Sequence, residues 1–177
     1  MIRKVLIVSD SHGKSENIRK AIKKEKPDML VHLGDIEDDP EKIRGWLDAV
    51  TDGPKPVPAV FIQGNCDRYG GRELKNSAIF ELNGYRFFCT HGHVQGVNYG
   101  LENLIFTAME NECDIVMYGH THFPLDEEYG AFGSPDGCDV RILNPGSISL
   151  PRGGSNKSYM VMTFDENENY EVELKDL

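Results

Sequence analysis

Five apolar runs in the sequence each lead into Asp, Asn or His residues. The runs are VLIVSDSH, MLVHLGD, AVFIQGNCD, FFCTHGH and IVMYGHTH, and the residues at their ends are Asp10, His12, Asp35, Asn65, Asp67, His91, His93, His120 and His122. Carboxylate and amide oxygens combined with imidazole nitrogens suit Mn, Fe, Zn, Co or Ni, whereas Ca prefers oxygen ligands alone. The pattern therefore predicts a metal centre, with enough ligands for two ions if one carboxylate bridges them.

The first half of the chain alternates between predicted strands and predicted helices. Continuous apolar runs, which are typical of strands buried on both faces, lie at 5–8, 29–33 and 59–62. One helix is expected between Ser15 and Pro27, and a second begins at Pro40. This order implies parallel strands, and such sheets bind ligands outside the carboxyl ends of their strands. We therefore expect the polar residues after the runs to meet at one edge.

The second half predicts a hairpin, one helix and several short strands. Asn83-Gly84 is a strong hairpin turn signal between strands at 78–82 and 86–90. A helix is expected over 99–112. Further strands are expected at 114–119, 141–143, 159–164 and 170–174.

The predicted fold class is α/β, with two mixed β-sheets packed as a sandwich and helices on the outer faces. One domain is expected over residues 1–177, because no linker marks a boundary, and 130–137 is expected to be a loop. His32, in the middle of an apolar run, is interpreted as a core histidine whose hydrogen bonds are satisfied. The residues expected on core faces include Phe106, Met109, Met117 and Met160.

Composition excludes several broad classes of function. The 177 residues include 19 Lys and Arg and 29 Asp and Glu, a formal net charge of −10. This charge repels nucleic-acid backbones, so no general nucleic-acid binding is expected. No apolar stretch approaches the ~20 residues of a membrane span or resembles a signal peptide, so we expect no membrane association and a cytoplasmic location. The cysteines, interpreted as free thiols, are Cys66, Cys89, Cys113 and Cys138.

The motifs DSH, GD, GNCD, HGH and GHTH stand in the order typical of the calcineurin-like metallophosphoesterase superfamily, which this chain resembles from Asp10 to about Arg152. The sequence NPGS at 144–147, followed by Pro151-Arg152, is similar to the small single-domain phosphodiesterase branch. The resemblance implies a four-layer fold of two mixed sheets between helices. It also implies a phosphoester small-molecule substrate and two divalent ions, with Mn expected and Ni, Fe, Zn or Co as alternatives.

The resemblance also implies a role for each candidate residue. The first metal would be bound by Asp10, His12, Asp35 and His122, with Asp35 as the bridge, and the second by Asn65, His91 and His120. Two divalent ions, two carboxylates and one bridging hydroxide leave a net charge of +1, which suits a phosphate whose phosphorus that hydroxide attacks in line. Asn65, Asp67 and His91 are the expected catalytic residues, with Asp67 orienting a histidine or a water. Cys66 and His93 are candidates for contact with substrate or support of the ligands.

Cys66 departs from the pattern of many superfamily members, which carry His at this position as a general acid for the leaving group. A thiol has a pKa near ~8.5 and forms weak hydrogen bonds, so it is a poor substitute. We therefore expect a phosphodiesterase that acts on diesters with good leaving groups. A phosphomonoesterase is an alternative.

Two further alternatives come from other classes. Cys66 and Arg72 have the Cys-x5-Arg spacing of cysteine-dependent phosphatases, although no His precedes the cysteine and Glu73 follows the arginine. A non-catalytic interaction scaffold on the same fold, like a retromer subunit that has lost metal ligands, is the other. Every expected ligand type is present here, which favours the enzyme. Homo-oligomers occur among relatives, so self-association is possible.

Overall fold

The computed structural model describes residues 2–51, 53, 55–67, 74–130 and 139–177, and its strands form two five-stranded sheets. In order across the first sheet, the strands are β10 (Tyr170–Asp176), β9 (Ser158–Phe164), β1 (Lys4–Val8), β2 (Met29–His32) and β3 (Ala59–Phe61). The second sheet has the order β4 (Ser77–Leu82), β5 (Tyr85–Thr90), β6 (Ile115–Met117), β8 (Asp139–Pro145) and β7 (Pro124–Gly130). Arg72, Cys138 and most of the expected loop at 130–137 lie outside the described residues.

Both sheets are mixed, as predicted. Strands β1, β2 and β3 are parallel, and β9 and β10 add antiparallel pairings. In the second sheet β5, β6 and β8 are parallel, with β4 and β7 antiparallel at the edges. Each sheet therefore has a group of parallel strands whose carboxyl ends point the same way.

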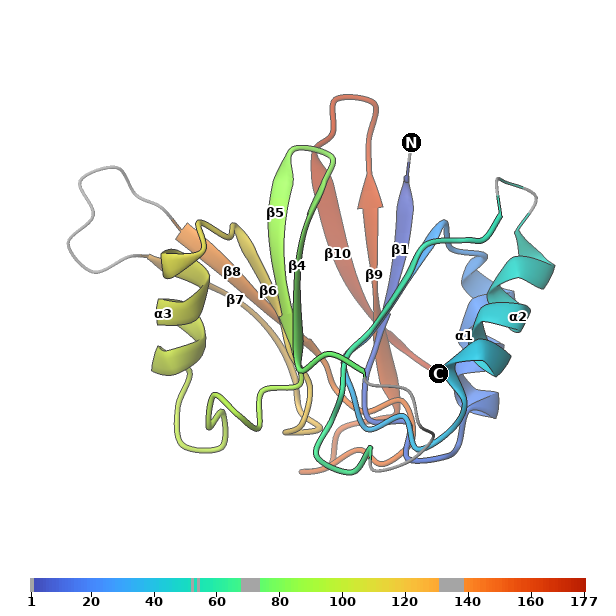
Figure 1. The fold of residues 1–177 in the computed structure, drawn as a ribbon, viewed down its shortest axis with the longest axis horizontal. Coiled ribbons are helices and arrows are strands. Elements are labelled where there is room, and N and C mark those ends of the chain that lie inside the picture. The colour runs from blue at the N-terminus through green and yellow to red at the C-terminus, as the bar shows by residue number, and fades with distance from the viewer. Residues whose placement is uncertain (1, 52, 54, 68–73, 131–138) are drawn as a thin grey trace.

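Helices cover the outer faces of the two sheets, which completes four layers (Figure 1). Helices α1 (Glu16–Glu25) and α2 (Pro40–Val50) lie on the first sheet, and α3 (Glu102–Glu110) lies on the second. The predicted fold class is confirmed. Among the described residues, no helix is long and apolar enough to cross a membrane.

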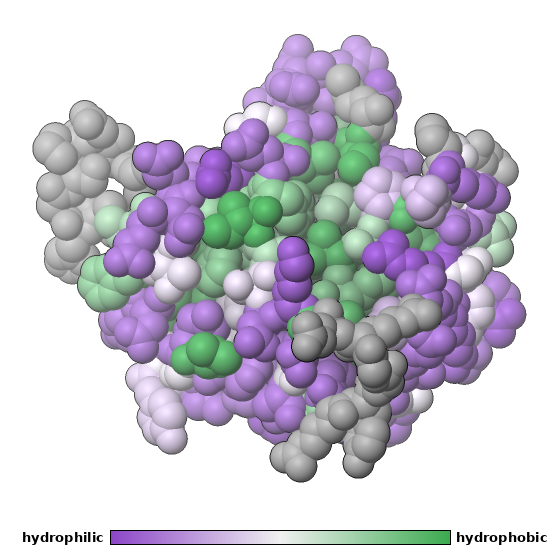
Figure 2. All heavy atoms as spheres, in the orientation of Figure 1, coloured by the Kyte–Doolittle hydropathy of each residue, from purple (hydrophilic) through white to green (hydrophobic). Residues whose placement is uncertain are grey.

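Strand β1 shows why its apolar run is continuous. Val5 and Ile7 pack between the two sheets, against residues such as Phe87, whereas Leu6 and Val8 face α1 and α2. All four are almost fully buried, because the sheet is covered on both faces. On the face drawn in Figure 2, hydrophobic residues gather in the middle and hydrophilic ones surround them.

Most predicted elements are present with slightly different ends, and one strand escaped prediction. The hairpin strands match closely, whereas α3 begins three residues later than expected. Ser15 is the N-cap residue of α1 but its side chain makes no capping hydrogen bond, because its hydroxyl donates to the carboxylate of Asp38. Strand β7, PLDEEYG, gave no strand signal because it is an edge strand with several exposed polar residues and no apolar alternation.

Two residues expected in the core are exposed. Phe106 and Met109 on α3 are 62% and 41% exposed, whereas Met117 and Met160 are buried as predicted. The sheet covers only one stripe of α3, and the buried positions are Leu104 and Ala108, four residues apart. The prediction for Phe106 and Met109 was wrong because an apolar side chain does not by itself say which face of a helix is covered.

Substitutions on α3 should separate the covered stripe from the open one. We expect Leu104→Ala to lower the free energy of unfolding by about 2–5 kcal/mol, because it removes a fully buried side chain. Phe106→Ala should change it by about 0.5 kcal/mol or less. Urea unfolding of both variants measures this, and equal destabilisation would contradict the placement of α3.

Candidate metal centre

The predicted ligands follow the carboxyl ends of parallel strands in both sheets. Asp10 and His12 follow β1, and Asp35 follows β2. From the second sheet, His91 follows β5, and the loop with His120 and His122 follows β6. Figure 1 shows these loops together at one end of the sandwich. The predicted ligands therefore meet at an edge that is formed by loops from both sheets.

The backbone of these loops is unusual. Five predicted ligands have left-handed φ angles, at 54° for Asp10, 44° for His12, 54° for Asp35, 67° for His120 and 63° for His122. Such a conformation costs a residue other than glycine roughly 1 kcal/mol or more and persists where surrounding contacts enforce it. Backbone bonds between the loops supply this, since Asp10 N donates to the Gly34 carbonyl (3.0 Å) and His12 N to the Asp35 carbonyl (2.9 Å).

Two glycines allow the loops to approach one another. A Cβ on Gly64 would lie 2.1 Å from Asp35 Oδ1, and one on Gly119 would lie 2.0 Å from Ser9 Oγ. Neither neighbour can move away cheaply, because Asp35 and Ser9 are buried. The glycines at these positions are therefore required by close packing around the site.

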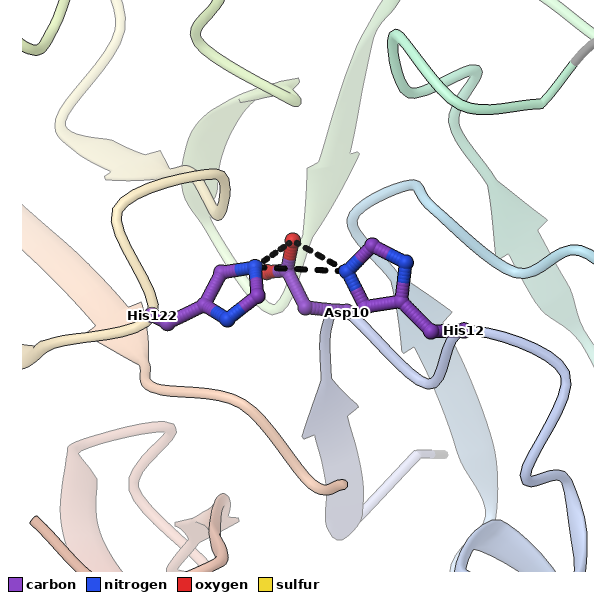
Figure 3. Close-up of side chains that lie close together, drawn as sticks. All are labelled: Asp10, His12 and His122. Carbon is purple, nitrogen blue, oxygen red and sulfur yellow. Dashed lines mark hydrogen bonds and ion pairs between the residues drawn. The ribbon is translucent and has the colours of Figure 1, made fainter. Parts of the chain in front are cut away.

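Asp10, His12 and His122 form the first cluster (Figure 3). Asp10 Oδ1 lies 3.1 Å from His122 Nε2 and 4.0 Å from His12 Nε2. The two Nε2 atoms are 3.3 Å apart. Asp10 is fully buried, and its Oδ1 has no hydrogen-bond partner. All three side chains thus point one polar atom at a common volume.

The hydrogen bonds made by the Nδ1 atoms of His12 and His122 determine whether their Nε2 atoms carry a proton. His12 Nδ1 donates to Glu37 Oε2 (2.9 Å), and His122 Nδ1 donates to the Leu150 carbonyl (2.5 Å). A neutral ring that donates from Nδ1 has only a lone pair at Nε2. Two lone pairs and a carboxylate therefore face each other, and a cation between them removes the repulsion. The donor set fits a divalent metal ion.

Asp35, His91 and Asn65 repeat this arrangement beside the first cluster. His91 Nδ1 donates to the Leu33 carbonyl (2.7 Å). Its Nε2 lies 3.4 Å from Asp35 Oδ2 and 3.1 Å from Asn65 Oδ1. Asp35 Oδ2 is also 3.8 Å from His12 Nε2. Asp35 thus lies close to histidines of both sets, as does Asp10, whose Oδ1 is 4.0 Å from His91 Nε2.

The charges of the site keep its carboxylates ionised. Burial raises the pKa of Asp10, but pairing with His122 and the positive charges of His91 and His122, which these rings carry when each takes a second proton, outweigh burial and leave the pKa of Asp10 below its usual value. The pKa of Asp35 is likewise lowered, because the hydrogen bond and charge of His91 overcome burial. For the same reason the pKa of His91 is raised in spite of burial. The metal-free site thus holds carboxylates ready to bind a cation.

The remaining predicted residues lie around this core. His120 is not in a ligand cluster of the described residues: its Nε2 accepts from the Asn98 amide (2.9 Å), and its ring centroid is 5.1 Å from that of His91. The His93 ring lies 5.4 Å from that of His91, and its Nδ1 is buried without a hydrogen-bond partner. The Cys66 sulfur lies within 4.8 Å of ligand atoms of His12 and Asp35.

Asp67 joins two loops. Its Oδ1 accepts from the backbone N–H of Glu37 (2.9 Å), and its Oδ2 accepts from that of Gly64 (2.8 Å). Glu37 in turn accepts a hydrogen bond from the ring of His12. Asp67 therefore helps to position the predicted ligand His12 through the backbone of Glu37.

Sequence reasoning missed several residues that hold the ligands. Glu37 and Asn98 bond the rings of His12 and His120, and the carbonyls of Leu33 and Leu150 bond those of His91 and His122. Backbone carbonyls leave no signal in a sequence. Glu37 follows Asp35 by two residues, and only its acidic type beside a ligand loop hinted at this role.

His32 is a satisfied core histidine, as predicted, and it also connects two ligand loops. Its Nδ1 accepts from the N–H of Gly34 (3.2 Å), so its Nε2 carries the proton and donates to Ser11 Oγ (3.1 Å). Ser11 lies between Asp10 and His12, and Gly34 precedes Asp35. The ring is fully buried, and burial lowers its pKa to about 4.

The fold and the cluster of candidate metal ligands agree with the protein family that the sequence matches. Residues 4–167 match the calcineurin-like phosphoesterase superfamily domain, so the chain belongs to that superfamily. It is 31% identical over 165 residues to a probable metallophosphoesterase, YsnB of Bacillus subtilis, covering 92% of this chain and 85% of that protein. It is 29% identical over 182 residues to the phosphodiesterase YfcE of Escherichia coli, covering 92% and 88%.

Solved structures agree with the fold. A crystal structure of a predicted phosphoesterase from Streptococcus pneumoniae has a TM-score of 0.74 and 29% identity, covering 98% of this chain and 89% of that one. Vps29 of Chaetomium thermophilum has a TM-score of 0.69, covers 99% and 97%, and is 16% identical. At that identity the likeness to Vps29 concerns the fold alone.

Replacement of Glu37 should weaken metal binding. We expect Glu37→Ala to reduce the affinity for Mn²⁺ about tenfold or more, because the carboxylate orients the ring of His12 and makes it more basic. Titration calorimetry of the metal-stripped chain measures this. Glu110→Ala, an exposed change on α3, is the matched control, and equal affinity in the two variants would exclude the role of Glu37.

His32 should make the metal-free chain sensitive to acid. An unfolded histidine binds a proton near pH 6.5, whereas folded His32 resists protonation until about pH 4. The unfolded state thus binds more protons between these values, and stability falls as the pH drops through this window, by about 2 kcal/mol between pH 7 and 4.5. His32→Gln should lose correspondingly less over the same range. Urea unfolding at both pH values tests this, and parallel losses in the two proteins would refute it.

Proposed function

We propose that the chain is a phosphodiesterase that depends on two divalent metal ions. The observation that carries the proposal is the set of imidazole Nε2 atoms of His12, His91 and His122, each directed at Asp10 or Asp35 while its Nδ1 donates elsewhere. Membership of the superfamily and the relatives named as phosphodiesterases support the activity.

In this proposal the ligands divide as the resemblance implies. Asp10, His12 and His122 would hold one ion, and Asn65, His91 and His120 would hold the other, with His120 Nε2 exchanging the Asn98 amide for the ion. Asp35 would be shared between them, which its distances of 3.8 Å to His12 Nε2 and 3.4 Å to His91 Nε2 support. Bound ions of this kind supply an activated water at neutral pH and polarise the phosphoryl oxygens for in-line attack.

The chain itself contributes orientation and charge. Glu37, Leu33 and Leu150 keep the ligand rings in the tautomer that presents Nε2 to the ions. Asn65 and His91 act as ligands at the reacting centre. Asp67 holds the Glu37 backbone and the loop of Gly64, so its contribution is to position His12 and Asn65.

The environment of Cys66 argues against a cysteine-dependent phosphatase. Burial, a hydrogen bond with Asp35 and the nearby charges of Glu37 and Asp67 raise the thiol pKa to about 11. A nucleophilic cysteine needs the opposite shift. A thiol is also a weak partner for a leaving group, so we propose diesters with good leaving groups as substrates, in preference to monoesters.

Mn as the native ion, a cytoplasmic location and self-association stay predictions from the sequence. The scaffold alternative rests on likeness of fold to proteins such as Vps29. The converging ligand atoms favour the enzyme.

Hydrolysis of bis-p-nitrophenyl phosphate tests the proposal. We expect metal-stripped protein to be inactive and added Mn²⁺ to restore turnover, with the diester cleaved faster than p-nitrophenyl phosphate. Faster cleavage of the monoester would keep the metal centre and reject the diesterase assignment. No activity with any divalent ion would favour the scaffold.

His91→Ala and Asp35→Asn should each reduce turnover on the order of 100-fold or more, because each removes a ligand from the site. Circular dichroism should show a retained fold, since the core is independent of these side chains. Glu110→Gln on α3 is the matched control. Unchanged turnover in both site variants would reject the assignment of the ligands.

A further inference from the structure

Exposed apolar side chains gather in the loops around the metal centre. Among the described residues, the large exposed hydrophobic side chains are Ile79, Val94, Tyr99, Phe106, Met109, Phe123, Leu150, Leu174 and Leu177. Four of these, Val94, Tyr99, Phe123 and Leu150, lie in loops that carry or hold the candidate ligands. The others lie on β4, α3 and β10 and at Leu177.

Phe123 is an exposed ring on a fixed backbone. It follows His122 directly and is 47% exposed. Its N–H donates to Thr121 Oγ1 (3.3 Å), which itself accepts from the amide of Asn144 (3.1 Å). The ring packs against bare backbone at Gly153, where an added Cβ would lie 2.0 Å from it. The ring is thus held in place while much of its surface stays open.

Leu150 lies close to the same ligand. Its carbonyl accepts from His122 Nδ1 (2.5 Å), its N–H donates to Ser147 Oγ (2.7 Å), and its side chain is exposed. Phe123 and Leu150 therefore present apolar surface from two segments that both contact His122.

Tyr99 lies in the loop after β5, next to a residue that contacts His120. It is 97% exposed, and the preceding residue, Asn98, donates its amide to His120 Nε2. Exposed residues with large apolar side chains therefore lie on segments that contact His120 and His122, the two histidines of the loop after β6. The ring of His12, by contrast, contacts the carboxylate of the exposed acidic residue Glu37.

We propose that Tyr99, Phe123 and Leu150 form an apolar rim that binds an aromatic ester group of the substrate. This inference rests on the proposed function, because a phosphoryl group held at the metal centre must extend its ester groups into these loops. An aromatic group gains by stacking on a ring that is already ordered. Glu37 and the negative net charge disfavour a substrate with a second phosphate. The substrate class is therefore a phosphodiester with one negative charge and at least one aromatic ester group.

Binding of two simple diesters tests the rim without turnover. Diphenyl phosphate and dimethyl phosphate carry the same charge and differ in their ester groups. We expect Mn²⁺-loaded protein to bind diphenyl phosphate more tightly in titration calorimetry. Phe123→Ala and Tyr99→Ala should each reduce that preference by about fivefold, by loss of ring contact, and leave the affinity for dimethyl phosphate unchanged. Phe106→Ala, an exposed aromatic change on α3, should reduce neither.

The outcomes separate the rim from the activity. A smaller preference in either folded variant supports the rim, and Tyr99→Ala serves if Phe123→Ala fails to fold. Equal binding of both diesters by the unmodified protein, binding of neither, or an unchanged preference in both variants would overturn it. A preserved preference in a protein that no metal renders active would count against the phosphodiesterase activity alone.

Discussion

The repulsion between lone pairs at the ends of β1, β2, β5 and β6 is the constraint on which this structure depends. His12 Nε2 and His122 Nε2 lie 3.3 Å apart with Asp10 Oδ1 beside them, and none of the three has a proton to share when both rings are neutral and donate from Nδ1. Such a cluster persists only if the surrounding chain enforces it or a cation joins it. Left-handed backbone at Asp10 and His122 shows that the chain enforces it.

The ligand cluster is held in place by the two sheets and by polar side chains that connect their loops. The parallel strands of each sheet end at the same edge, so loops distant in sequence meet there. Ser147 Oγ donates to the Asp10 carbonyl (2.7 Å), and the amide of Asn144 donates to the Gly119 carbonyl (3.0 Å). The NPGS segment thus stabilises ligand loops without supplying a ligand, and His32 does the same from inside the first sheet.

The same arrangement separates charge around the proposed reaction. Carboxylates and imidazoles occupy the centre, acidic Glu37 lies beside His12, and apolar Phe123 lies in the loop after β6. On an acidic protein, bound cations would be the main attraction for a phosphate. Selection among phosphates would then depend on the uncharged groups around the centre, which is why the rim bears on substrate class.

Hydrophobic period and ligand type were enough to predict the fold class and the residues at the strand ends. Apolar runs such as 5–8 indicate buried strands. The ability of Asp and His side chains to bind metal depends on residue type, so it can be read from the sequence before their positions are known. The sequence could not show that Phe106 faces solvent, that PLDEEYG pairs as an edge strand, or that Glu37 orients His12. Those features depend on which surfaces meet in space, and contacts between distant segments leave no periodic signal. The sequence alone determined the buried strands and the chemistry of the ligands, whereas only the tertiary structure decided how the ligands face one another, because that depends on packing between the two sheets.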